Sequence, residues 1–152
     1  MLSSKKEVHE LNEDVKRDGA VIHGKNITLY PTNTCFDDAM DHLQELVNEN
    51  PARRYSGEYV LVHGILDNGD HQYAHAWLET DQWAIDGRYF KDKHVMCEFD
   101  KKGYYLELNV VEKTVYTVQQ TLAMNLKHGT FGPWEEKYRK LCKPREIRKH
   151  IP

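Results

Sequence analysis

The sequence predicts an α+β domain in which an amphipathic helix packs on an antiparallel β-sheet. Apolar residues recur at helical spacing from Phe36 to Val47, which predicts the helix. The segments 58–66, 71–79 and 82–86 are rich in aromatic and alternating residues, which predicts strands. Because only short polar turns separate these three segments, we expect two consecutive antiparallel hairpins.

The two turns predict which residues of the hairpins face each other. If Thr80 and Asp81 are the two loop residues, His75 faces Asp86 directly, with Cβ atoms about 4.5–5.5 Å apart. An imidazole and a carboxylate at that separation are within hydrogen-bonding reach. Asn68-Gly69 is a strong hairpin signal and places Val62 opposite His75 and His63 opposite Ala74. Since side chains alternate along a strand, His63 then points away from the face that carries His75.

Cys35 lies at the predicted start of the helix. Thr32, Asn33 or Thr34 can cap this helix, and Asp37 and Asp38 are typical of a first turn. The unpaired N–H groups of a helix start favour a thiolate and can also donate to an oxyanion. The two aspartates oppose a thiolate unless their side chains point away.

The residues around His75 carry a family resemblance. His75-Ala-Trp-Leu-Glu79, followed by Trp83 and Asp86, resembles the H-x-W-x-E…W-x-x-D stretch of the transglutaminase-like cysteine enzymes, which belong to the papain-like fold group. Cys35-Phe36 is similar to the Cys-aromatic pair that those enzymes place at a helix start. The resemblance covers residues 31–90 and implies a transglutaminase-like core with Cys35 as nucleophile, His75 as general base and Asp86 as its orienting acid.

A Cys-His-Asp triad processes amides through a thioester. The resemblance therefore implies a protease, a glutamine deamidase or a transglutaminase with a protein or peptide substrate, and the triad does not choose among these reactions. Arg88 can pair with Asp86 or bind a substrate carboxylate. The alternative is a catalytically degenerate relative that acts as a protein-binding module. The candidates for oxyanion and substrate contacts are Asn33, Gln72, Tyr73, Trp77 and Arg88.

A metal site is the rival explanation for nine histidines and three cysteines. His71 shares a predicted strand face with His75, and His94 lies three residues before Cys97, which permits a mixed zinc site. The sequence has no CxxC and no HExxH motif, however, and Asp86 accounts for His75 without a metal. We therefore expect no metal and no other cofactor.

The composition is that of a small soluble protein with a single domain over residues 1–152. A net charge of −3 gives no case for a nucleic-acid partner. No segment approaches membrane-spanning length, and no apolar leader precedes the domain, so we expect a cytoplasmic location. Three cysteines without framework spacing are typical of a reducing compartment. The oligomeric state is not indicated.

The flanking segments complete the predicted architecture. Residues 1–20 form a peripheral segment with a surface helix over 4–17, and residues 143–152 form a solvated tail. We expect short strands at 20–23 and 26–30, extended segments at 104–111 and 114–118, and a helix over 133–142. Another helix is predicted to begin at Thr117, to end at Gly129 and to carry Val118, Leu122, Ala123 and Leu126 on one face.

Overall fold

The computed structural model describes residues 34–90 and 92–142 with their side chains, and the backbone of 9–11, 15–17, 20–22 and 27–31. The helices are α1 Cys35–Glu49, α2 Arg53–Ser56, α3 Lys101–Leu108, α4 Val118–His128 and α5 Glu136–Arg139. The strands are β1 His9–Leu11, β2 Val15–Arg17, β3 Ala20–Ile22, β4 Ile27–Pro31, β5 Val60–Asp67, β6 Gln72–Glu79, β7 Trp83–Phe90, β8 Lys93–Asp100 and β9 Val110–Tyr116.

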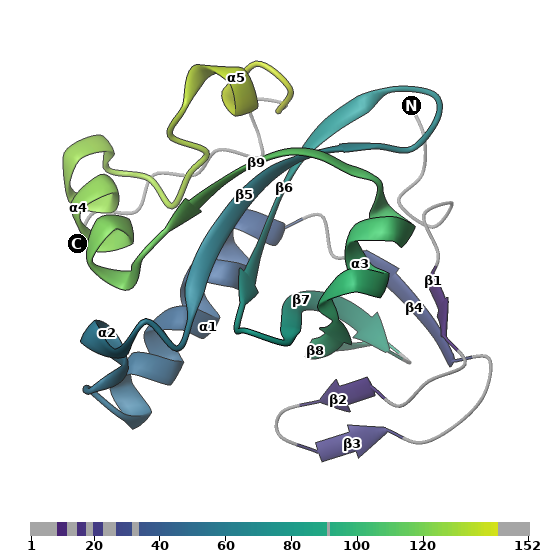
Figure 1. The fold of residues 1–152 in the computed structure, drawn as a ribbon, viewed down its shortest axis with the longest axis horizontal. Helices are drawn as coiled ribbons and strands as arrows, with labels where there is room; N and C mark the ends of the chain where they lie inside the picture. The colour runs from purple at the N-terminus through teal and green to yellow at the C-terminus, as the bar shows by residue number, and fades with distance from the viewer. Residues whose placement is uncertain are drawn as a thin grey trace.

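The strands form one antiparallel sheet in the order β3-β2-β8-β7-β6-β5-β9, and β4 joins it by pairing with both β1 and β7. The hairpins β5-β6 and β7-β8 make the centre of the sheet, and the short strands β2 and β3 lie beside β8 (Figure 1). The predicted α+β class with an antiparallel sheet is confirmed. Among the residues described, no helix is both long and apolar enough to cross a membrane.

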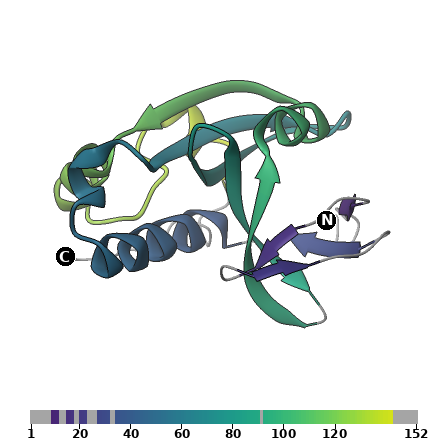
Figure 2. The same cartoon turned by 60° about the horizontal axis from the view of Figure 1, so that its bottom comes forward.

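The two faces of the sheet bury separate apolar clusters. One cluster joins α1 to the sheet through residues such as Phe36, Met40, Ala76 and Leu78. The other lies under α3 and includes Trp77. Helix α1 runs along one side of the sheet in Figure 2, with its apolar stripe turned towards the strands. The predicted helix on an antiparallel sheet is therefore present, with Cys35 as its first residue.

Both central hairpins differ from the predicted register by two residues. Gly64, rather than Val62, faces His75, and Leu78 faces Ile85. Each turn between the paired strands spans four residues instead of two. In one turn the Asn68 N–H donates to the His71 carbonyl at 3.3 Å, and in the other the Thr80 N–H donates to the Trp83 carbonyl at 2.9 Å. A shift of two residues keeps every side chain on its predicted face, because the side-chain period of a strand is two.

One edge of β7 has two partners in succession. β6 pairs with it at Ala84 and Ile85, and β4 pairs with it at Arg88 and Tyr89. Since β8 occupies the other edge of β7 along its whole length, β6 and β4 must share this edge. Asp86 and Gly87 lie at the point where the partner changes.

The prediction of an extended segment over 104–111 is wrong for its first part, because residues 101–108 form α3. The side chain of Asp100 caps this helix by accepting the N–H of Gly103 at 3.1 Å, and Asn109 ends it in the left-handed conformation with φ +51°. Tyr104 and Leu108, one turn apart, are its buried residues. Helical spacing thus overrides the strand propensity of the aromatic residues.

The predicted surface helix over 4–17 is also wrong where the chain is described. Residues 9–11 pair with β4, and residues 15–17 pair with β3 and β8, so sheet pairing replaces a helix there. The short strands expected at 20–23 and 26–30 are confirmed as β3 and β4. The predicted tail over 143–152 lies outside the described residues.

Two helices near the carboxyl end differ from expectation. α4 is confirmed, with a capping box at Thr117 and Gly129 at its end, but its buried residues are Val118, Thr121 and Asn125. Of the predicted apolar face, Val118 is buried, whereas Leu122, Ala123 and Leu126 are exposed, because another side of the helix turns towards α2, β5 and β9. The helix predicted over 133–142 is limited to Glu136–Arg139, since Trp134 is buried in the core and its indole N–H donates to the Thr130 carbonyl at 2.9 Å.

Candidate active site

Cys35 is a free, half-buried cysteine at the first position of α1. Thr34 is the N-cap residue, but its hydroxyl donates to the Asp38 carboxylate at 2.9 Å rather than capping a backbone N–H. The first-turn N–H groups of an α-helix have no partner inside the helix. Cys35 therefore belongs to the turn whose backbone N–H groups have no partner inside the helix.

The Asp38 carboxylate, which was expected to oppose a thiolate, has partners of its own. Its Oδ1 lies 3.1 Å from Nε2 of His94 on β8, in addition to the Thr34 hydroxyl. Its other oxygen reaches β7 at Gly87, where a Cβ atom would lie only 2.6 Å from Oδ2. A residue without a side chain at position 87 thus allows the carboxylate to lie against β7.

His75 contacts both of the other predicted triad residues. Its Nε2 lies 2.7 Å from Oδ2 of Asp86, and the Cys35 thiol lies near enough to raise the pKa of the imidazole. Because Nε2 is occupied by Asp86, Nδ1 is the ring nitrogen available to the thiol. The ring stacks on Trp77 with centroids 5.8 Å apart and an interplanar angle of 29°. The structure therefore brings Cys35, His75 and Asp86 together, although the strand register places Asp86 diagonally and not directly opposite His75.

Asp86 Oδ2 accepts from three donors. Besides His75, these are Nη1 of Arg88 at 2.5 Å and the hydroxyl of Tyr104 at 2.6 Å. Asp86, Arg88 and Tyr104 are all buried, with exposed fractions of 1%, 2% and 3%. The carboxylate is thus held on one side by the imidazole and on the other by a buried cation and a buried hydroxyl.

The charges of these groups favour an ionised site. Burial lowers the pKa of His75, but the charges of Asp86 and Cys35 and the hydrogen bonds to both raise it from 6.5 to about 10. Burial raises the pKa of Asp86, yet Arg88 and His75 together with the Tyr104 hydrogen bond hold it well below its usual value. Burial and the adjacent Asp86 raise the pKa of Tyr104 well above 10, so its hydroxyl remains a donor.

The remaining predicted site residues occupy different environments. Arg88 pairs with Asp86, which is the first of the two roles considered for it. Trp77 is fully buried beneath His75 and donates its indole N–H to Glu79 at 2.8 Å. Tyr73 lies on the same strand face as His75 and is half-buried, whereas Gln72 is exposed on the opposite face. Asn33 lies outside the described residues.

Two residues of this region were not predicted from the sequence, Tyr104 and His94. Tyr104 belongs to a segment that was expected to be extended, and its helical position brings it to Asp86. The signal that could have found it is Asp100 as an N-cap, followed by Tyr104 and Leu108 at a spacing of four. His94 pairs with Asp38 across two elements, and no local sequence signal indicates that contact.

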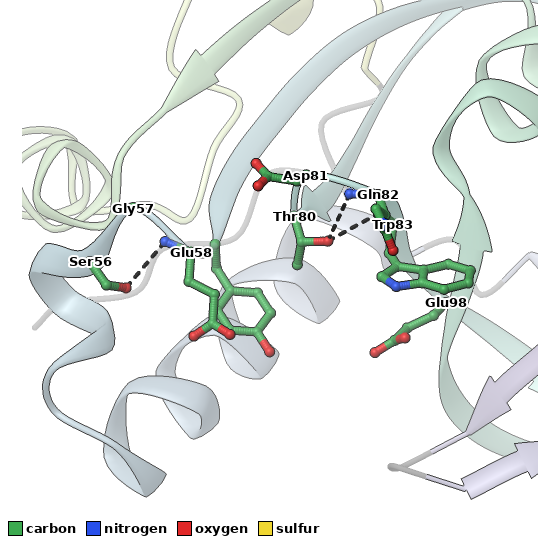
Figure 3. A pocket seen from close by; sticks show the side chains of 9 residues that line it. Ser56, Gly57, Glu58, Thr80, Asp81, Gln82, Trp83 and Glu98 are labelled. Carbon is green, nitrogen blue, oxygen red and sulfur yellow. Dashed lines mark hydrogen bonds between the residues drawn. The ribbon is translucent and has the colours of Figure 1, made fainter.

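A separate hollow lies near the other end of α1. This open cavity of about 620 Å³ is lined by residues 56–59, the turn 80–83 and Glu98 (Figure 3). The Thr80 hydroxyl accepts the N–H groups of Gln82 and Trp83 within it. Cys35, His75 and Asp86 are not among the residues that line it. No group of three or more His, Cys, Asp or Glu side chains within the described ranges is placed to hold a metal ion.

Comparisons with models of protein families, with curated proteins and with solved structures found no match for this chain.

Proposed function

We propose that this chain is a cysteine-dependent amide-processing enzyme that works through a thioester on Cys35. The observation that carries the proposal is the position of His75, whose Nε2 lies 2.7 Å from the Asp86 carboxylate and whose pKa is raised by the nearby Cys35 thiol as well. A thiol, an imidazole and a carboxylate in this order are the parts that nucleophilic cysteine catalysis needs. The transglutaminase-like pattern in the sequence points to the same three residues.

The chemistry follows from the roles of these groups. The Cys35 thiolate attacks the carbonyl carbon of an amide, and the first-turn N–H groups of α1 donate to the oxyanion. The His75 imidazolium gives its proton to the departing nitrogen as the carbon–nitrogen bond breaks, which leaves a thioester. Neutral His75 then takes a proton from the incoming acceptor as that acceptor bonds to the thioester carbon, and the carbon–sulfur bond breaks with release of the Cys35 thiolate, which restores the thiolate and imidazolium. Water as acceptor gives proteolysis or glutamine deamidation, and a primary amine gives transamidation.

Iodoacetamide labelling tests the nucleophile directly. We expect Cys35 to be modified faster than Cys97 and Cys142 in the native protein at pH 7, because the His75 imidazolium lies near Cys35 and favours its thiolate. The His75→Ala variant should label more slowly at Cys35. Cys142→Ser is the matched control, since Cys142 is also half-buried, and it should leave the labelling of Cys35 unchanged.

Three readouts then separate the reactions. Peptide cleavage, ammonia release from a glutaminyl protein and incorporation of a fluorescent primary amine report proteolysis, deamidation and transamidation, and each should be lost in Cys35→Ser. If Cys35 labels no faster than Cys97 and Cys142, or labels equally fast in His75→Ala, the enzymatic proposal is wrong. That result would favour the non-catalytic protein-binding module.

A further inference from the structure

We propose that Arg88 and Tyr104 are positioning residues that set how strongly Asp86 binds the proton of His75. This inference rests on the function proposed above. It begins from the fact that one oxygen atom, Asp86 Oδ2, receives His75 Nε2, Arg88 Nη1 and the Tyr104 hydroxyl, at 2.7, 2.5 and 2.6 Å. Three donors on one oxygen compete for the same electron density, so each weakens the hold of the carboxylate on the other two.

The two additional donors are fixed in place by their surroundings. Tyr104 comes from α3, which packs over this face of the sheet, and Arg88 lies two residues after Asp86 on the same face of β7. The guanidinium of Arg88 also donates to the Gly87 carbonyl at 2.9 Å and lies over the ring of Phe99 at 5.2 Å. Since both side chains are buried, little water is present to compete with them for the Asp86 carboxylate.

The formal charges show why a second cation matters. With Cys35 as thiolate and His75 as imidazolium, Asp86 and Arg88 bring the sum over the four groups to zero. Without Arg88, the buried Asp86 carboxylate would have only the His75 imidazolium as a cation within hydrogen-bonding distance. It would then stabilise the imidazolium form of His75 more strongly through the Nε2 hydrogen bond, which makes the proton on Nδ1 harder to release, because an opposite charge nearby favours the charged form.

The consequence for the proposed reaction concerns proton transfer. His75 must release its proton to the leaving nitrogen, and an imidazolium that is too weak an acid does this slowly. Arg88 and Tyr104 therefore have a role beyond stability: they keep the orienting carboxylate ionised while leaving the His75 proton transferable. A purely structural role would leave the titration of His75 unchanged when either donor is removed.

Tyr104→Phe tests this inference in the full chain, by following the imidazole nitrogens of His75 with NMR as the pH is raised. We expect the midpoint of the His75 titration to move upward by about half to one pH unit, because Asp86 loses one competing donor. Arg88→Met should move it further in the same direction. If Arg88→Met does not fold, Tyr104→Phe still decides the question.

Tyr105→Phe is the matched control, because it removes the neighbouring hydroxyl on the same helix, which donates to Glu79 and not to Asp86. It should leave the midpoint of His75 in place. An unmoved midpoint in Tyr104→Phe, or an equal shift in Tyr105→Phe, overturns the inference. The rate of Cys35 alkylation is a separate readout. Slow alkylation of Cys35 together with a shifted His75 midpoint contradicts the enzymatic proposal alone. Fast alkylation of Cys35 together with an unmoved His75 midpoint contradicts the positioning role alone.

Discussion

His63→Leu should remove a specific part of the acid sensitivity of this protein. His63 is fully buried in a cage formed by Phe36, Tyr116 and Trp134, with ring centroids 4.9, 5.0 and 4.9 Å from its own. Neither of its ring nitrogens has a hydrogen-bond partner among the described residues. Burial lowers the pKa of His63 from 6.5 to about 3, since no neighbouring charge offsets the loss of solvent.

The magnitude follows from proton linkage. Between pH 6.5 and 3 the unfolded chain binds a proton at His63 that the folded chain does not, so the free energy of unfolding falls as the pH falls. Because His63 stays neutral in the folded chain, it lowers the free energy of unfolding by about 2 kcal/mol at pH 5 and by about 0.2 kcal/mol at pH 7. His75 contributes with the opposite sign, because its pKa is raised: its stabilisation is fully present below pH 6.5 and is lost as the pH rises towards about 10.

Urea unfolding of wild type and His63→Leu at pH 7 and pH 5 is the appropriate assay. On going from pH 7 to pH 5, the free energy of unfolding of the variant should rise by about 2 kcal/mol relative to that of wild type. The contribution of His75 is the same in both proteins and cancels in this comparison. His71→Leu is the control for replacing an imidazole with an apolar side chain, because this histidine is exposed in the hairpin turn. A difference between wild type and His63→Leu that stays constant with pH would refute the claim that folding keeps His63 neutral.

Three further substitutions test other contacts, each by urea unfolding at pH 7. Asp86→Asn should lower the free energy of unfolding by about 3–5 kcal/mol, because it leaves the buried Arg88 guanidinium without its carboxylate. Adding Arg88→Met should recover part of that loss, and additive losses in the double variant would contradict the pairing. Gly64→Ala should lower the free energy of unfolding by about 1–3 kcal/mol, since the new Cβ would lie 2.4 Å from Cη2 of Trp77. An unchanged free energy of unfolding would argue against this close approach. Thr117→Ala should cost about 0.5–2 kcal/mol through loss of the capping box of α4, whereas no change would mean that this cap contributes nothing.

The pairing of His75 with Asp86 could be predicted because it depends mainly on which face of a strand a residue occupies. Alternation fixes that face from the sequence alone, and both hairpins kept it despite four-residue turns in place of two-residue turns. The start of α1 at Cys35 could be predicted for a similar reason, since the apolar spacing of a helix is local. These predictions required no knowledge of distant contacts.

The partners of the site could not be predicted, because they come from distant elements. Tyr104 reaches Asp86 only because residues 101–108 are helical, and its aromatic neighbours favoured a strand in the sequence. His94 reaches Asp38 through the packing of β8 beside β7, close to where α1 begins. At the amino end, the charged residues 9–11 and 15–17 have no strong strand pattern, and pairing with β4, β3 and β8 decides their conformation.

The shared edge of β7 links the amino-terminal strands to the reactivity of the thiol. β4 ends at Pro31 and α1 begins at Cys35, so the Cα atoms of these two residues are four steps along the chain from each other and can lie at most about 14 Å apart. A strand held on β7 at Tyr89 therefore restricts where the sulfur can lie relative to the imidazole. Detaching β4 would relax that restraint without altering Cys35, His75 or Asp86, so the free energy of one short strand pairing is thermodynamically coupled to the geometry of the Cys35 and His75 pair.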